Sequence, residues 1–205
     1  MSRPRKDDPQ SAATARIEAA FWQLLEEVGY PEITVRRVTQ LAGVNRNSFY
    51  YHYDSMEGLA REAFMGNAAD ARSLISRLIA GFRDDSTRLA QPAGSTLEHA
   101  KRVMLCARSE SPFLKSLVNN MLRDVWLGEL GIEQNLLSKE DRAQVEFIFA
   151  GLVAVLGGAE ASESPLVMAR LADSRIGRAS LAALQDMAKR QGGAVNLQIA
   201  GEMFG

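Results

Sequence analysis

The sequence predicts an all-α protein with a helix-turn-helix near its N-terminus, followed by a larger helical part. Three observations predict this fold class. Apolar residues recur at helical spacing along most of the 205 residues. Capping residues and glycines punctuate these series where helices would begin and end. The chain is 46% hydrophobic, enough for a substantial core, and no segment needs a β-strand to account for its pattern.

The first helix is predicted over residues 11–28 and ends at Gly29. Its apolar residues recur at i, i+3, i+4, i+7, i+8 and i+11, so they share one face. We expect that face to pack over the helix-turn-helix as its support. The apolar residues are Ile17, Ala20, Phe21, Leu24, Leu25 and Val28.

The helix-turn-helix lies within residues 34–59. Thr34 is placed to cap its first short helix, and Gly43 can take the positive φ that ends that helix and turns the chain. Val44 can then fill the corner between the two helices. The residues predicted to share the apolar face are Val35, Val38, Leu41 and Ala42.

The second short helix begins at Asn45, whose side-chain oxygen can accept a hydrogen bond from the backbone N–H of Asn47 or Ser48. The positions expected to be exposed carry a guanidinium, an amide and three hydroxyls. These groups pair with base edges and phosphate oxygens in a DNA major groove. They are Arg46, Asn47, Ser48, Tyr50 and Tyr51.

The charge of this segment also favours DNA. The whole chain has a formal net charge of −1, yet no acidic residue lies between Glu32 and Asp54. Arg36, Arg37 and Arg46 make the interval positive, so a polyanion meets no repelling carboxylate there. Because the basic charge is clustered and not abundant, we expect a compact footprint and modest non-specific affinity.

Several of these side chains have alternative interpretations. Tyr50 and Tyr51 are expected to contact DNA, although they can also be packing aromatics, and Tyr53 is assigned to the core. His52 either binds a phosphate or caps local backbone. The full predicted DNA-binding set is Thr34, Arg36, Arg37, Asn45, Arg46, Asn47, Ser48, Tyr50, Tyr51 and His52.

Two basic features remain open. Arg36 and Arg37 are solvated surface charges or phosphate contacts, and one of them reaching a phosphate is favoured over both doing so. The basic arm at residues 3–6 either enters a minor groove or is a free tail, and Asp7 and Asp8 offset its charge.

The sequence resembles a known family at this point. Ala-Gly-Val at 42–44, Asn-Arg-Asn-Ser-Phe-Tyr-Tyr-His-Tyr at 45–53 and Asp-Ser-Met-Glu-Gly-Leu at 54–59 resemble the signature of TetR-type transcriptional regulators. The resemblance is dense from Ile17 to Leu59 and rests on length and helical pattern beyond that. It implies a DNA-binding domain at residues 1–54 and a helical effector-binding and dimerisation domain at residues 55–205.

Three positions depart from the family pattern. Met56 stands where the family usually has a lysine that touches a phosphate. Tyr53 stands where phenylalanine is usual, which adds a hydroxyl to a packing position. Arg37 stands where an acidic residue often follows the helix cap, which removes a favourable charge near a helix N-terminus. These changes put the standard phosphate contacts in doubt but not the fold.

Helices are expected through the rest of the chain. A long helix capped by Ser55 runs to Phe82, and the resemblance makes it the lever between the two domains. A loop at 84–96 is followed by helices at 97–108 and 111–129, the second with Pro112 in its first turn. After a loop at 131–137, the last two helices are expected at 138–161 and 165–189, with a possible break near Asp173.

The helix at 138–161 contains small residues beside its apolar series, which lets another helix approach closely. One interpretation is tight packing within a subunit. The other, which the resemblance favours, is that this helix and the one at 165–189 pair with their copies in a homodimer that reads a palindromic double-stranded operator. The small residues are Ala150, Gly151, Ala154, Gly157, Gly158 and Ala159.

A sensor would also need an apolar cavity in the helical body. Methionine and aromatic side chains suit a site that accepts varied shapes, although such residues are more often plain core. The candidate lining residues are Phe82, Met104, Phe113, Met121, Trp126 and Phe147.

Other function classes are disfavoured. The single cysteine, Cys106, fits a reducing compartment and is expected to be a buried small hydrophobe, with a redox-sensing thiol as the alternative. No signal peptide or apolar run of membrane-spanning length is seen, so a cytoplasmic location with no membrane partner is expected. His52 and His99 lie far from each other and from Cys106, without metal-ligand spacing, and the glycines match no cofactor fingerprint. No nucleophile and base pair up for catalysis, so we do not expect an enzyme.

The sequence thus predicts a dimeric, DNA-binding repressor that a small effector releases from its operator. The alternative is a DNA-binding regulator that takes no small ligand and is controlled by a partner protein.

Overall fold

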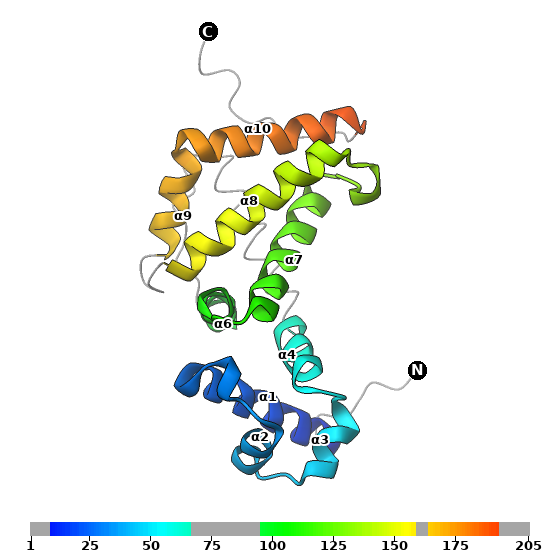
Figure 1. Cartoon of the computed structure of the whole chain (residues 1–205), viewed down its shortest axis with the longest axis vertical. Helices are drawn as coiled ribbons and strands as arrows, with labels where there is room; N and C mark the ends of the chain where they lie inside the picture. Colours follow the sequence, from blue (N-terminus) through cyan, green and yellow to red (C-terminus); the bar gives the residue numbers. More distant parts are fainter. Residues whose placement is uncertain (1–8, 67–94, 159–163, 193–205) are drawn as a thin grey trace. The chain divides into compact units, whose positions relative to one another are not determined.

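A computed structural model describes residues 9–66, 95–158 and 164–192 of the chain. Every regular element in these ranges is helical, which confirms the predicted all-α class (Figure 1). The elements are α1 (Pro9–Val28), the 3-10 helix η1 (Tyr30–Glu32), α2 (Val35–Ala42), α3 (Arg46–His52), α4 (Met56–Met65), α6 (Ser95–Arg108), α7 (Pro112–Glu129), the 3-10 helix η2 (Gln134–Leu136), α8 (Lys139–Gly158), α9 (Ser164–Asp173) and α10 (Arg175–Arg190).

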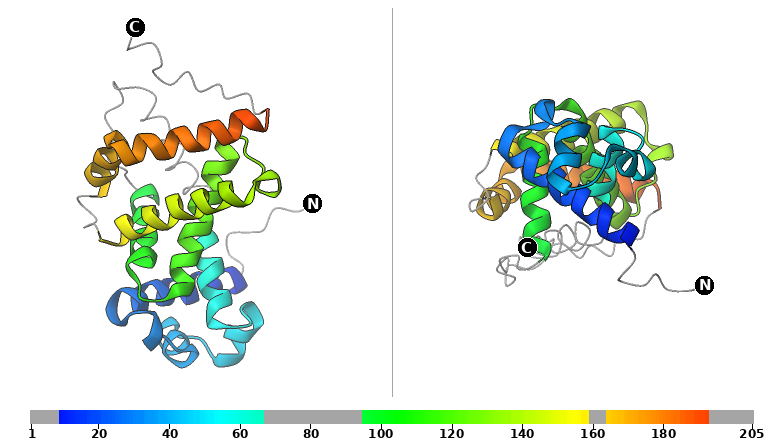
Figure 2. Two further views of the ribbon diagram at one scale, coloured as in Figure 1. Left: turned by 45° about the horizontal axis from the view of Figure 1, so that its top comes forward. Right: turned by 90° about the horizontal axis from the view of Figure 1, so that it is seen from below.

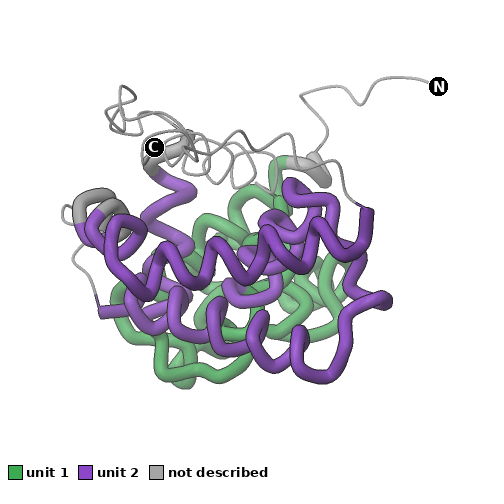
Figure 3. Tube along the Cα trace, turned by 90° about the horizontal axis from the view of Figure 1, so that it is seen from above, with its two compact units in different colours: residues 1–67, 109–117 green, residues 68–108, 118–205 purple. Residues whose placement is uncertain are grey.

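The chain divides into two compact units, coloured separately in Figure 3. Unit 1 comprises residues 1–67 and 109–117, and unit 2 comprises residues 68–108 and 118–205. The start of α7 therefore belongs to unit 1, and its remaining turns belong to unit 2.

In unit 1, α1 packs against α2, α3 and α4, as the sequence predicts for a supporting helix. The predicted apolar face of α1 is buried except at its last residue, Val28, which is 41% exposed. The predicted apolar face of α2 is wrong at Leu41, whose side chain is 44% exposed. The eight-residue α2 buries Val38, Thr39 and Ala42, and Leu41 lies off the face that these three residues share.

The turn between α2 and α3 has the predicted caps. Thr34 accepts a hydrogen bond from the backbone N–H of Arg37 at 3.2 Å. Gly43 adopts φ 64° and ψ 36°, in the left-handed region that favours glycine. Its N–H donates to Gln40 O and that of Val44 donates to Thr39 O, which satisfies carbonyls that α2 would otherwise leave unpaired.

The helix α4 begins at the predicted cap, since the Ser55 hydroxyl accepts from the backbone N–H of Gly58 at 3.0 Å. Leu59 and Ala60 are fully buried, and Ala63 and Phe64 nearly so. The predicted continuation of this helix to Phe82 lies outside the described residues, as does the basic arm at residues 3–6.

In unit 2, α8 packs against α6 and α10, and α10 also packs against α9. Figures 1 and 2 show the end of α10 near the start of α8. The predicted break near Asp173 is present, because α9 ends at Asp173 and the Ser174 side chain caps α10 by accepting from Gly177 N–H at 3.0 Å. The segment predicted as a loop at 131–137 contains η2.

Candidate nucleic-acid interface

The helix α3 is held on unit 1 by two aromatic side chains. Phe49 is fully buried, and Tyr53, directly after the helix, is 1% exposed as its assignment to the core predicts. The Tyr53 hydroxyl donates to Glu18 Oε1 of α1 at 3.0 Å. Burial, followed by the negative charge of Glu18, raises the pKa of Tyr53 well above that of a free phenol, so the hydroxyl stays protonated.

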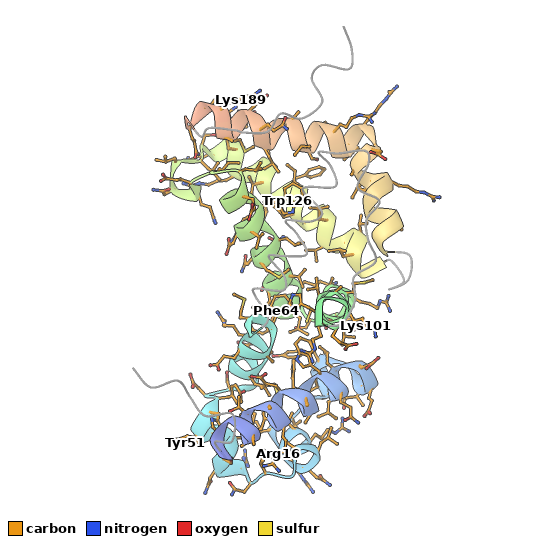
Figure 4. The ribbon with its side chains drawn as sticks, turned by 180° about the vertical axis from the view of Figure 1, so that it is seen from behind. Arg16, Tyr51, Phe64, Lys101, Trp126 and Lys189 are labelled. Atoms are coloured by element: carbon orange, nitrogen blue, oxygen red, sulfur yellow. The ribbon has the colours of Figure 1, made fainter. Side chains whose placement is uncertain are left out.

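The opposite face of α3 is exposed. Arg46, Asn47, Tyr50 and Tyr51 occupy successive positions on this face, with Tyr50 49% and Tyr51 71% exposed. Figure 4 labels Tyr51 on α3. Together the four side chains present a guanidinium, a carboxamide and two phenols to solvent, the groups that can pair with base edges and phosphates.

Arg46 and Tyr50 also contact each other one helical turn apart. The guanidinium carbon of Arg46 lies 5.6 Å from the centre of the Tyr50 ring, and Arg46 Nη2 donates to the Tyr50 hydroxyl at 3.4 Å. Both side chains are exposed, so the pair is weak but orients the guanidinium along the helix face.

Two predicted site residues are engaged in capping. Asn45 Oδ1 accepts from the backbone N–H of Ser48 at 2.7 Å, the bond predicted from the sequence. Thr34 caps α2 in the same way. Both residues remain exposed.

His52 is half-buried at the end of α3. Its Nδ1 lies 3.4 Å from Thr14 Oγ1 of α1, and the Tyr51 ring meets it edge-on with centres 5.0 Å apart. This contact joins α3 to α1 through two side chains, so it is neither a cap of local backbone nor a phosphate contact, and both interpretations of His52 stay predictions.

The two arginines of α2 differ in their surroundings. Arg37 Nη1 donates to the carbonyl of Glu32 at 3.0 Å and lies 3.8 Å from its carboxylate. Arg37 thus ties α2 to η1. Arg36 is exposed, and no ion pair involves it in the described parts of the chain. Of the two, Arg36 is the more available cation.

Arg16 of α1 is a basic residue that the predicted DNA-binding set omits. It is exposed, and its Nη1 lies 4.0 Å from the point that a β carbon on Gly43 would occupy. Arg16 therefore adds a positive charge beside the turn between α2 and α3. The helical spacing of α1 indicates part of this, because Arg16 directly precedes the buried Ile17. Only the tertiary packing brings Arg16 close to Gly43. Figure 4 labels Arg16.

The candidate pocket residues do not share one environment. Met104 and Met121 are buried and Trp126 is half-buried, all three in unit 2. Phe113 belongs to unit 1, and Phe147 on α8 is 76% exposed. Phe82 lies outside the described residues. A ligand site lined by these residues stays a prediction.

Among the described residues, no three His, Cys, Asp or Glu side chains come together in an arrangement that could hold a metal ion. No helix in the described ranges is both long and apolar enough to cross a bilayer.

Residues 17–63 match the family model of bacterial regulatory proteins, tetR family. This span covers most of α1 together with α2, α3 and nearly all of α4, the elements that carry the exposed polar face. Over these residues, the chain belongs to the tetR family. The tetR match agrees with the resemblance seen in the sequence and makes the chain a DNA-binding regulator.

Outside residues 17–63, the comparisons with known proteins give less information about the chain. No curated protein gives a significant match to the chain. A solved structure described as a gamma-butyrolactone receptor (ArpA like protein) is similar at 17% identity, covering 88% of this chain and 96% of that one, with a TM-score of 0.40.

Proposed function

We propose that the chain is a sequence-specific, dimeric repressor that leaves its operator when a small effector binds its helical body. One observation, the exposed face of α3, supports the DNA-binding function. Phe49 and Tyr53 are buried and anchor the helix to unit 1. The exposed side chains are Arg46, Asn47, Tyr50 and Tyr51. Residues 1–54 form the DNA-binding domain, and residues 55–205 form the effector-binding and dimerisation domain.

The α3 side chains read base edges in a major groove, where guanidinium and carboxamide groups have the geometry for paired hydrogen bonds. Phosphate contacts hold the register. Arg36 is the favoured phosphate contact because Arg37 is engaged with Glu32. Arg16 adds a second phosphate contact beside the turn.

The dimer is proposed to form through α8 and α10. Small residues on α8 face outward in the single chain, since Ala150, Ala154 and the two glycines Gly151 and Gly158 are exposed. A β carbon on either glycine would meet nothing within 4 Å. Phe147, 76% exposed, stands on the same face.

On α10, Ile176 is 67% exposed. A large apolar side chain beside a small-residue surface suits a self-complementary two-fold interface, because each Phe147 can pack on the partner's small residues. To read successive major grooves, such a dimer would need its two recognition helices about 34 Å apart.

Release by an effector needs a ligand that binds better to the conformation unable to bind DNA. A coupling of about 1 to 3 kcal/mol would lower operator affinity some 5- to 150-fold. The effector site is proposed in unit 2, where Met104 and Met121 are buried and Trp126 is half-buried.

The DNA-binding proposal is tested by selecting bound duplexes from a random library with the purified full chain. We expect a palindromic consensus. Arg46→Ala and Asn47→Ala should each weaken binding to the selected duplex by about 1 to 3 kcal/mol per lost base contact. Gln23→Ala, on the exposed surface of α1 outside this face, is the control. Wild-type affinity in both α3 variants would contradict the assigned face.

Dimerisation is tested by sedimentation of the full chain and of Phe147→Glu. We expect a dimer for the wild type and a monomer for the variant, because two buried carboxylates would face the small-residue surface without partners. Leu136→Glu, which changes another exposed apolar residue outside α8 and α10, is the control. A dimer of unchanged strength in Phe147→Glu would reject this interface.

The effector proposal is tested by screening small apolar compounds for release of the selected duplex. Release by a compound that also quenches the fluorescence of Trp22→Phe, in which Trp126 is the one remaining tryptophan, supports a site in the helical body. If only a protein fraction releases the duplex, control by a partner protein replaces control by an effector.

A further inference from the structure

The first turn of α7 is built into unit 1. Ser111 and Leu114 are buried, Leu114 completely, and the Ser111 hydroxyl accepts from the backbone N–H of Leu114 at 3.4 Å. The same helix continues for three further turns into unit 2 as residues 118–129. A segment distant in sequence from the helix-turn-helix is therefore one of the structural parts of the unit that carries it.

Two other residues of unit 1 contact the ring of Phe113. Its ring stacks on Tyr30 of η1, with centres 6.1 Å apart and planes 29° from parallel. The guanidinium of Arg61 on α4 lies 5.8 Å from the centre of the same ring. Offset stacking and a cation over the ring face are both favourable geometries.

Tyr30 and its 3-10 helix η1 also contact the helices of unit 1. The Tyr30 ring meets the Phe21 ring of α1 edge-on, with centres 6.5 Å apart. Two residues after Tyr30, the carbonyl of Glu32 accepts from Arg37 of α2. The 3-10 helix η1, directly before the Thr34 cap, thus contacts Phe113 through Tyr30 and α2 through Glu32.

We propose that Phe113 is a positioning residue for DNA binding, whose stack on Tyr30 fixes η1 and through it the placement of α2 and α3. The proposal rests on the DNA-binding function proposed above and adds a second route of control besides α4. A ligand or partner that shifts α7 acts on the helix-turn-helix through this ring.

Plain core filling would predict a different outcome. If Phe113 only buries apolar surface, leucine should replace it with little effect, because leucine is also apolar and of similar bulk. If the stacked ring matters, leucine should fail and tyrosine should succeed. Non-specific binding depends mainly on the number of positive charges near the phosphates, which tolerates small shifts of α2 and α3, so it should survive the loss of the ring.

The test compares full-length wild type with Phe113→Leu, Phe113→Tyr, Tyr30→Leu and the double leucine variant. Affinity is measured for the selected duplex and for a scrambled duplex of equal length. Lys115→Ala, exposed two residues further along α7, is the matched control. Amide hydrogen exchange of residues 35–42 is followed in each protein.

We expect Phe113→Leu to weaken specific binding roughly 2- to 10-fold, the size of an aromatic pair contribution, and to leave scrambled-duplex affinity unchanged. Phe113→Tyr and Lys115→Ala should bind as wild type. Tyr30→Leu should weaken specific binding at least as much as Phe113→Leu, because it also removes the contact with Phe21. The double variant should lose less than the sum of the two single losses, because the two variants share the Phe113–Tyr30 contact. Exchange of α2 amides should quicken in the leucine variants alone.

Wild-type affinity and exchange in Phe113→Leu would overturn the proposal. Equal losses on both duplexes with a drop in helicity would also overturn it, since they indicate simple destabilisation. If the wild type selects no duplex, the DNA-binding function fails by itself, and the exchange of α2 still decides whether Phe113 positions it.

Discussion

Gly157 of α8 lies against the backbone of Ala107 in α6, so closely that a β carbon at position 157 would lie 2.6 Å from the Ala107 carbonyl oxygen. Real β carbons do not approach a carbonyl oxygen this closely, so the two helices meet where only glycine fits. Within unit 2, this contact sets the spacing between α6 and α8.

Gly157→Ala should therefore destabilise the protein. The added methyl group forces the two backbones apart, an overpacking penalty of about 1 to 3 kcal/mol that exceeds the gain of roughly 1 kcal/mol from replacing a helical glycine. Urea unfolding measures the change. Gly128→Ala on α7 is the control, because its β carbon would meet nothing within 4 Å, and it should be neutral or stabilising.

This glycine shows where the sequence stops being informative. The sequence identifies a run of small residues in α8 but leaves open whether they pack within one subunit or against a second copy. Both interpretations have support for different residues, since Gly157 meets Ala107 while Gly151 and Gly158 face outward. Gly157 and Gly158 are neighbours in the sequence but lie on different sides of α8. Only the position of α6 shows which of them packs within the subunit.

Local signals predicted the helix-turn-helix well. Thr34, Asn45 and Ser55 cap the three helices as expected, and Gly43 has the predicted left-handed conformation. Each of these caps, and the turn at Gly43, depends on a few adjacent residues, so it can be predicted from the sequence alone. Leu41 was assigned wrongly because in a helix of eight residues the choice of buried face depends on the neighbouring helices.

The tertiary parts of the site were not predictable. Arg16 reaches the turn at Gly43 from another helix, and Phe113 reaches Tyr30 from a segment about eighty residues away in the chain. The methionine and aromatic pattern that suggested a pocket contains no information about which unit each residue joins. Phe113 and Phe147 consequently have environments that composition alone does not separate.

Tyr53→Phe and Tyr51→Phe should separate stability from DNA binding. Tyr53→Phe removes the hydrogen bond to Glu18 and should lower the free energy of unfolding by about 1 kcal/mol. Tyr51 is 71% exposed, so removing its hydroxyl should leave unfolding unchanged and weaken binding to the selected duplex. Denaturant titration and a gel-shift titration measure the two effects. The reverse pattern would exchange the roles assigned to these tyrosines.

Met56→Lys should raise DNA affinity and make it more sensitive to salt. Met56 opens α4 where TetR-type regulators usually have a phosphate-contacting lysine, and one additional phosphate contact steepens the slope of log affinity against log salt by about 0.9. Anisotropy titrations at several salt concentrations measure the slope. Met56→Gln, similar in size but uncharged, should leave it as in the wild type. A lysine variant with the wild-type slope would place the phosphate out of reach.

Cys106 should be inert in the folded protein. Its side chain is fully buried, and desolvation by burial raises the pKa of the thiol to about 12. At neutral pH the reactive thiolate is therefore almost absent, which disfavours the redox-sensing interpretation. A thiol reagent should label Cys106 only after denaturation. Rapid labelling of the native protein, with release of the selected duplex on oxidation, would restore a sensing role.

The contacts of Asp141, in the first turn of α8, should stabilise the folded protein in a pH-dependent way. Its carboxylate accepts from the Ser138 hydroxyl at 2.8 Å and from the Ser138 N–H at 3.3 Å, and it pairs with Arg190 of α10. The hydrogen bonds from Ser138 first, and then Arg190, lower the pKa of Asp141 below that of a free aspartate. The folded state therefore binds this proton less well than the unfolded chain.

A lowered pKa fixes the sign of the effect. The stabilisation is fully present above the unfolded pKa of about 3.9, and it is lost as the pH falls through the folded value. Asp141→Asn should thus be less stable than the wild type at neutral pH, and the difference should shrink in acid. Glu140→Gln, one residue earlier and without these hydrogen bonds, controls for the charge at the start of α8. Urea unfolding of the three proteins from neutral pH into acid measures this difference. A constant difference in the free energy of unfolding between wild type and Asp141→Asn would reject the assignment.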